Sequence, residues 1–224
     1  MEQSSLKSLL GVESSKWMMH PSERLVILGL LSVLRPKCVL EFGCAEGGLT
    51  YWLSQYCQEV VTVDLDPKVL AVTKGLANVT PLCMTTLEAA KRIESEGTRY
   101  DLTIIDADHS QYGVQRDLEN AMRFSKVVVL HDTFYPPCRE GILAALADRD
   151  IYYNLDLVQG GLQPDGCWGG LGIVVPGIKR KVPTYITPRL SPYPWLQRLW
   201  SIQQFTKVLH SKIGRLFRRL LTTR

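Results

Sequence analysis

The stretch that decides the fold lies between residues 38 and 64. It reads CVLEF at 38–42, GCAEGG at 43–48, LTYWLSQY at 49–56 and, after three more residues, VVTVD at 60–64. A short apolar run that passes directly into a glycine-rich turn predicts a strand followed by a helix. The β-branched run at 60–64 predicts the next strand, which ends on an acid. Strand, turn, helix and strand in this order predict two parallel neighbouring strands.

The same alternation continues on both sides of this unit. Upstream, Ser22 is a plausible N-cap, leucines recur at helical spacing from Leu25 to Leu34, and Pro36 follows. Downstream, we expect strands near 80–84, 102–106, 127–130, 152–158 and 171–175, and helices over 67–76, 86–96, 111–124 and 138–149. The pattern predicts an α/β, Rossmann-like fold: a mostly parallel seven-stranded sheet with helices on both faces.

Charge divides the chain unevenly. The 26 basic side chains include 11 between Gly177 and Arg224, where no Asp or Glu occurs, so the preceding residues carry 15 basic against 22 acidic side chains. We therefore expect three parts: an N-terminal helical segment or lid over 1–35, a core domain over 36–176, and a basic C-terminal extension over 177–224. The basic excess indicates an anionic partner for the extension.

Cysteine usage and hydropathy indicate a cytoplasmic protein. The six cysteines contain no C-x-x-C pair, which favours free thiols in a reducing compartment. The longest apolar run, 25–34, is short of the roughly 20 residues that span a bilayer.

The first strand ends in the pattern Glu41-x-Gly43-x-x-x-Gly47. Glycines here allow a tight turn and close approach to a ligand. A dinucleotide-binding turn would have glycine where Glu41 stands, so the pattern favours an aminoacyl-nucleoside over NAD. Asp64 ends the second strand, where an acid can accept both ribose hydroxyls, and Leu65 would then pack on the adenine. The alternative is a solvated turn aspartate.

Two later stretches resemble a known family. They are Tyr100-Asp101-Leu102-Thr103-Ile104-Ile105-Asp106-Ala107-Asp108-His109-Ser110-Gln111-Tyr112 and Val128-Val129-Leu130-His131-Asp132-Thr133. With the glycine turn, they are similar to class I S-adenosylmethionine-dependent methyltransferases, in particular the metal-dependent O-methyltransferases of the caffeoyl-CoA and catechol type. The Asp-Ala-Asp-His-Ser form resembles still more the branch with cephalosporin-hydroxylase-like proteins and sugar O-methyltransferases. The resemblance covers about 18–176.

The resemblance implies S-adenosylmethionine as the methyl donor. Backbone groups of Gly43, Cys44 and Gly47 would line its methionine part, while Glu41 would orient the loop from its strand. Thr85 or Thr86 falls where the family contacts the edge of the adenine.

The resemblance also implies a divalent cation on Asp106, His131 and Asp132. Hard oxygen ligands suit Mg²⁺, which would bind vicinal hydroxyls of a substrate and lower the pKa of the attacking one. His131 is a departure, because the family usually has an acid or its amide there. An imidazole ligand favours Mn²⁺ or another transition metal; otherwise His131 lies outside the ligand set, or the pair is a solvated turn.

His109, three residues after Asp106, resembles the general base of the sugar-methylating branch. Its ordinary pKa suits that role, and Asp106 would act beside it. The alternative is that His109 caps the helix beginning near Gln111. The lysine that the caffeoyl-CoA type carries here is absent.

The C-terminal extension combines four prolines with an amphipathic pattern. Apolar residues recur at helical spacing from Trp195 to Leu220, with arginines and lysines between them. This predicts an interfacial helix on an anionic membrane surface, which would place the enzyme at the inner face of the membrane. The alternatives are docking on the protein itself or on a partner subunit, binding to a polyanion such as RNA, and an ordinary packed helix.

The resemblance as a whole implies an O-methyltransferase that acts on a hydroxylated small molecule or glycan with the help of a metal. A nucleic-acid methyltransferase that uses the basic tail is the second hypothesis. A nucleoside-binding scaffold without turnover is the third.

Overall fold

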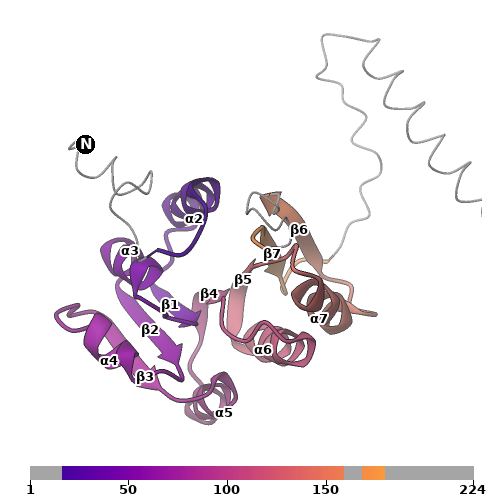
Figure 1. Cartoon of the computed structure of the whole chain (residues 1–224). Helices are drawn as coiled ribbons and strands as arrows, with labels where there is room; N and C mark the ends of the chain where they lie inside the picture. Colours follow the sequence, from indigo (N-terminus) through magenta and orange to yellow (C-terminus); the bar gives the residue numbers. More distant parts are fainter. Residues whose placement is uncertain (1–16, 159–167, 180–224) are drawn as a thin grey trace, which may run out of the picture. The chain divides into compact units, whose positions relative to one another are not determined.

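The computed structural model describes residues 17–158 and 168–179 (Figure 1). Its strands form one seven-stranded sheet in the order β3-β2-β1-β4-β5-β7-β6. The first five strands of this order are parallel, and β7 runs antiparallel to both of its neighbours. The strands are β1 (Cys38–Phe42), β2 (Glu59–Asp64), β3 (Val79–Cys83), β4 (Tyr100–Ile105), β5 (Ser125–His131), β6 (Tyr152–Val158) and β7 (Leu171–Val175). The predicted mostly parallel α/β sheet is confirmed.

Helices cover both faces of the sheet. They are α2 (Pro21–Leu34), α3 (Gly48–Tyr56), α4 (Lys68–Val72), α5 (Thr86–Glu96), α6 (Gln111–Phe124) and α7 (Pro136–Leu146). One buried cluster joins α2 and α3 to strand residues such as Val39, and the other joins α5, α6 and α7 to residues such as Leu40. Successive strand residues point to opposite faces, so a strand buried on both sides is almost entirely apolar.

The N-terminal helix begins differently from the sequence prediction. Its N-cap is His20, whose side chain accepts from the Ser22 amide, while Pro21 occupies the first turn and Glu23 closes a capping box. The prediction of Ser22 as the cap was therefore wrong. Proline is favoured in the first helical turn because the amide it lacks has no intrahelical partner there.

Two further helices differ at their ends. The helix predicted over 67–76 is only Lys68–Val72, and the one predicted over 138–149 already begins at Pro136. The five cysteines among the described residues are free thiols, and no helix in that part of the chain is long and apolar enough to cross a membrane. The predicted helix from Trp195 lies outside the described residues, so its attachment to an anionic membrane stays a prediction.

Candidate active site

The glycine turn after β1 brings two strand ends into contact. Gly43 has a φ of 95° and Gly47, the N-cap of α3, a φ of 77°, both in the left-handed region that favours glycine. A Cβ on Gly43 would lie 1.9 Å from the carbonyl oxygen of Asp106, which follows β4. The amide of Asp106 in turn donates to the carbonyl of Phe42. The close approach of the Asp106 carbonyl at the paired ends of β1 and β4 therefore requires a residue without a side chain at position 43.

Glu41 is buried in β1 beneath this turn. The hydroxyls of Thr50 and Thr62 each donate to its Oε2 at 2.6 Å, while Oε1 has no hydrogen-bond partner among the described residues. Burial outweighs the two hydrogen bonds and raises the pKa of Glu41 to about 7. These contacts tie β1 to α3 and β2, which supports the predicted role of orienting the loop.

Asp64, at the end of the neighbouring strand β2, binds the backbone of the glycine turn. Its Oδ2 accepts from the amides of Cys44 and Ala45, both at 2.9 Å, and its Oδ1 accepts from the amide of Asp66. The side chain thus fixes the glycine turn. Each carboxylate oxygen accepts about two hydrogen bonds, so Oδ1 retains an acceptor position for a ribose hydroxyl.

A cavity of about 510 Å³ opens beside the carboxyl ends of β1, β2 and β4. Its lining includes most of the residues predicted to hold the donor: Gly43, Asp64, Leu65, Thr85 and Asp106, together with Ala45, Val63, Met84, Thr86, Ala107, Asp108, His109 and Arg116. A smaller cavity of about 30 Å³ lies between Trp17, Met18 and Met19 on one side and Gly43, Cys44 and Asp106 on the other. The predicted donor residues are therefore grouped around one edge of the sheet, where parallel α/β folds bind ligands.

Thr85 has a local role that the sequence also signals. It is the N-cap of α5 in a capping box with Glu88: its hydroxyl accepts from the Glu88 amide and donates to the Glu88 carboxylate at 2.7 Å. The neighbouring Thr86 donates to the buried Asp117, and Arg116 donates to both. Arg116 lines the cavity and was missed, because nothing in the sequence distinguishes it from other helix arginines.

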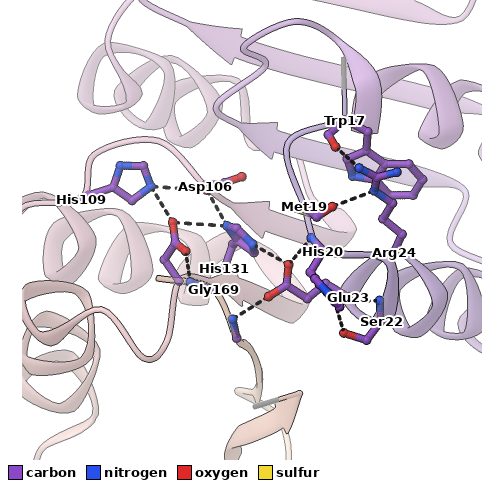
Figure 2. A network of polar contacts seen from close by, with 12 residues as sticks. Trp17, Met19, His20, Ser22, Glu23, Arg24, Asp106, His109, His131 and Gly169 are labelled. Atoms are coloured by element: carbon purple, nitrogen blue, oxygen red, sulfur yellow. Dashed lines mark hydrogen bonds and ion pairs between the residues drawn. The ribbon is translucent and has the colours of Figure 1, made fainter. Parts of the chain in front are cut away.

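Next to the cavity, Asp106, His109 and Asp132 offer ligand atoms that lie within 4.8 Å of one another. Nε2 of His109 lies 3.0 Å from Oδ2 of Asp132 and 3.4 Å from Oδ1 of Asp106 (Figure 2). The two carboxylates raise the pKa of His109 to about 9. Asp132 follows β5 with a φ of 51°, a left-handed conformation that is rare outside glycine, asparagine and aspartate. Ser110, not His109, is the N-cap of α6.

His131 lies behind this cluster. Its Nδ1 is 3.0 Å from Oδ1 of Asp106 and 3.4 Å from Oδ2 of Asp132, and its Nε2 is 3.2 Å from Oε2 of Glu23. Burial opposes protonation of the ring, but the three carboxylates outweigh it and raise the pKa of His131 well above its usual value. The structure brings Asp106, His131 and Asp132 together, as the sequence predicted. The side chain that shares a possible cation site with the two aspartates, however, is His109 and not His131.

Other residues of the site were missed by the sequence reasoning. Glu23 comes from α2, and the amide of Gly169 donates to Oδ1 of Asp132 at 2.6 Å. The ring of Trp168 stacks on Tyr135, with centroids 4.0 Å apart and planes at 9°, and meets the His109 ring nearly perpendicularly. Apart from Tyr135, these residues lie far from the aspartates in the sequence, and no spacing rule connects them.

Residues 40–133 match the family model of a methyltransferase domain. No curated protein matches the chain. Solved structures share its fold: the O-methyltransferase from Bacillus cereus in complex with S-adenosylhomocysteine has a TM-score of 0.60 at 19% identity, covering 78% of this chain and 92% of that one. TomG from Streptomyces achromogenes, an O-methyltransferase in complex with S-adenosylmethionine, has a TM-score of 0.60 at 15% identity, covering 78% and 90%.

The same fold also serves other acceptor atoms. The N-methyltransferase NodS from Bradyrhizobium japonicum has a TM-score of 0.57 at 17% identity, covering 77% of this chain and 96% of that one. The fold is thus that of the class I methyltransferases. Residues 40–133 thus carry a methyltransferase domain, and the described part of the chain has the fold of solved methyltransferases.

Proposed function

We propose that the protein transfers a methyl group from S-adenosylmethionine to a hydroxyl group of a small molecule or glycan, assisted by a divalent cation. The observation that carries this proposal is the placement of Asp106, His109 and Asp132 at the edge of the donor cavity. Asp106 and His109 belong both to the cluster and to the lining of that cavity. An acceptor held at the cluster therefore lies next to the donor.

The chemistry of the cluster fits a cation. Two carboxylates and an imidazole form a donor set for Mg²⁺ or Mn²⁺, and the imidazole favours Mn²⁺. Nε2 of His109 faces both carboxylates without the alignment of a hydrogen bond to any described group. A cation bound here lowers the pKa of a hydroxyl that coordinates it.

The protein's own residues have separate tasks in this proposal. Asp64 holds the glycine turn and the ribose, and Asp106 and Asp132 hold the acceptor side. With a pKa of about 9, His109 carries a proton at neutral pH while it faces the two aspartates alone. A ligand imidazole must be neutral, so His109 would have to give up this proton in order to hold the cation. The role of His109 as general base for the acceptor hydroxyl stays a prediction.

The aromatic pair beside the cluster supports an acceptor that contains a ring. Trp168 lies between Tyr135 and His109, with its ring centroid 5.4 Å from that of His109. Aromatic faces favour contact with aromatic rings and with the apolar faces of ring-shaped molecules. In a catechol-like or sugar-like acceptor, the ring would contact the aromatic side chains while the hydroxyls on the same ring reach the cation.

The test separates donor binding from cation dependence. Titration calorimetry with S-adenosylhomocysteine is expected to show binding with or without EDTA. Methyl transfer from labelled S-adenosylmethionine to a pool of phenols, catechols and sugars is expected to stop in EDTA and to return with Mg²⁺ or Mn²⁺. Full activity after exhaustive chelation contradicts the role of the cation. Donor binding without transfer to any acceptor supports the scaffold hypothesis, and transfer only to RNA supports the nucleic-acid hypothesis.

A matched pair of variants locates the cation. Asp132→Asn is expected to lose Mn²⁺ binding while it retains S-adenosylhomocysteine. Asp156→Asn removes an exposed acid of β6 that pairs with Arg139, and is expected to leave both affinities unchanged. Equal Mn²⁺ affinity in the two variants contradicts the assignment of the site.

A further inference from the structure

Glu23 is an acid of the N-terminal helix that lies in the interior of the protein. Only 3% of its surface is exposed, although it occupies the first turn of α2. Its Oε2 accepts from the backbone amide of His20 at 2.7 Å and lies 3.2 Å from Nε2 of His131. Its Oε1 accepts from the amide of Gly170 at 2.6 Å. One carboxylate thus joins three separate segments of the chain (Figure 2).

The contact between Glu23 and His131 connects the N-terminal helix to the cluster. The ring of His131 has Glu23 at one nitrogen and, at the other, Asp106 at 3.0 Å and Asp132 at 3.4 Å. An imidazole held at both nitrogens cannot rotate without losing a contact, so its orientation is fixed. Glu23 therefore determines from which direction His131 meets the two aspartates.

The contact between Glu23 and the amide of Gly170 connects the helix to Asp132 through the backbone. Gly170, held by Glu23, follows Gly169, whose amide donates to Oδ1 of Asp132. The same two glycines also hold the turn after Asp132. The carbonyl of Gly169 accepts a hydrogen bond from the amide of Phe134, and the carbonyl of Gly170 accepts one from the amide of Thr133. A Cβ on Gly170 would lie 2.5 Å from the ring of Phe134 and 2.8 Å from the hydroxyl of Thr133, so this backbone has little room to shift.

We propose that Glu23 is a positioning residue that sets the orientation of Asp106 and Asp132 for the cation. It acts through His131 on the first aspartate and through Gly170 and Gly169 on the second. The proposal rests on the proposed function, because the cation is part of that function. It assigns to the N-terminal helix a role in the acceptor half of the site.

Helix capping alone does not account for a carboxylate at this position. A capping box accepts glutamine as readily as glutamate at its third residue, because only one oxygen is needed. The chain contains a second capping box for comparison, Thr85 with Glu88, which lies on the exposed surface at the start of α5. At residue 23, a glutamine would turn its NH₂ group toward either the Gly170 amide or His131, both of which need an acceptor.

The experiment compares Glu23→Gln with Glu88→Gln in the full chain. Titration calorimetry with Mn²⁺ alone is expected to show a loss of affinity of about 10- to 100-fold for Glu23→Gln, the size typical of residues behind metal ligands. Glu88→Gln is expected to retain the wild-type Mn²⁺ affinity. Both variants are expected to bind S-adenosylhomocysteine as the wild type does, because neither residue lines the donor cavity.

A second measurement does not depend on the cation. In ¹H–¹⁵N spectra of the histidine rings at fixed pH, the resonances of His109 are expected to move in Glu23→Gln and to stay in place in Glu88→Gln. His109 has no contact with Glu23 among the described residues, so a change in its resonances is transmitted through His131 and the aspartates beside it. If the wild type fails to bind Mn²⁺, the proposed cation is wrong, and these resonances alone decide the role of Glu23.

Unchanged Mn²⁺ affinity and unchanged His109 resonances in folded Glu23→Gln overturn the proposal. If Glu23→Gln does not fold, Glu23→Asp replaces it, because it keeps the charge but is one methylene too short to hold His131 and Gly170 together. The same losses are then expected. A Glu23→Asp variant with wild-type values in both measurements overturns the proposal as well.

Discussion

The proposed donor half and the proposed acceptor half of the site are built in different ways. The donor half consists of Glu41, the glycine turn at 43–48 and Asp64, and its contacts are mostly between a carboxylate and nearby amides or hydroxyls. The acceptor half consists of Asp106, His109, His131 and Asp132 with Glu23 behind them, and its contacts are between charged side chains. The first half is confined to a short βαβ unit, whereas the second collects residues from three distant segments.

The two halves also respond to pH with opposite signs. Burial raises the pKa of Glu41, because no cation stands beside it. Burial acts in the same direction on Asp132 and Glu23, but their histidine partners outweigh it and lower both pKa values. The donor half therefore holds an acid that is easily protonated, and the acceptor half holds acids that stay ionised.

The largest expected effect comes from the residue where the halves meet. Gly43→Ala places a Cβ 1.9 Å from the Asp106 carbonyl in a left-handed backbone. Overpacking and strain each cost about 1–3 kcal/mol, so we expect a loss of about 3 kcal/mol or more in the free energy of unfolding, together with loss of both S-adenosylhomocysteine and Mn²⁺ binding. Urea denaturation and calorimetry measure these quantities.

The control is Gly29→Ala, in the exposed middle of α2, where nothing lies within 4 Å of the added Cβ. It is expected to gain about 0.5–1 kcal/mol from helix propensity. A Gly43→Ala variant that binds both ligands normally contradicts the contact between the halves.

Glu41 provides the next test, through pH. An acid whose folded pKa lies above its unfolded value holds its proton more tightly in the folded state, so stability is lost as the pH rises. Between its ordinary pKa of 4.5 and the folded value of about 7, this loss amounts to roughly 3 kcal/mol. Relative to the wild type, Glu41→Gln is therefore expected to gain stability by that amount from pH 4.5 to 8. Denaturant unfolding across this range measures it, with the exposed Glu94→Gln as control. Parallel curves for Glu41→Gln and the wild type contradict the raised pKa.

Asp64 tests the donor half alone. Asp64→Asn removes the charge that binds the loop amides and, in our proposal, the ribose, and charge-assisted hydrogen bonds contribute about 1.5–3 kcal/mol. We expect S-adenosylhomocysteine affinity to fall by that amount in calorimetry, while Mn²⁺ affinity stays at the wild-type value. Asp66→Asn, which removes an exposed acid two residues further on, is the control. Normal donor affinity in folded Asp64→Asn refutes the ribose assignment.

Thr85 gives the smallest effect and decides between two roles. Its hydroxyl already exchanges two hydrogen bonds with Glu88. Thr85→Ala is therefore expected to cost about 1 kcal/mol of stability through the lost cap, with S-adenosylhomocysteine affinity unchanged. Thr85→Ser keeps the hydroxyl and is expected to retain both. A drop in donor affinity for Thr85→Ala alone supports the predicted contact with adenine instead.

The fold and the donor half were largely predictable from the sequence. The glycine turn, the acid at the end of β2 and the alternation of strands are local patterns, and local patterns determine strand and turn formation. The short helix after Asp64 and the early start of α7 at Pro136 were missed, because helix ends depend on packing as well as on propensity. The five strands in parallel order followed from the βαβ alternation.

The acceptor half was predictable only in its aspartates. Asp106 and Asp132 follow strands, so their meeting at one sheet edge was expected from the topology. The grouping of His109, rather than His131, with the two aspartates in the proposed cation cluster was not, since it depends on which ring Glu23 holds. Glu23 itself looks like an ordinary helix-capping acid in the sequence, and only packing brings it to a histidine 108 residues away.

The contacts of Glu23 show that the family domain and the residues that build the site do not have the same boundaries. The recognised domain ends at residue 133, directly after Asp132, whereas two groups that hold its charged residues, Glu23 and Gly169, lie outside residues 40–133. A chimaera that exchanged only this span with a relative would inherit the donor pocket intact, and would bring aspartates to a host helix and a host loop that had not evolved with them. The segment that matches the family is therefore shorter than the segment that supplies the proposed site.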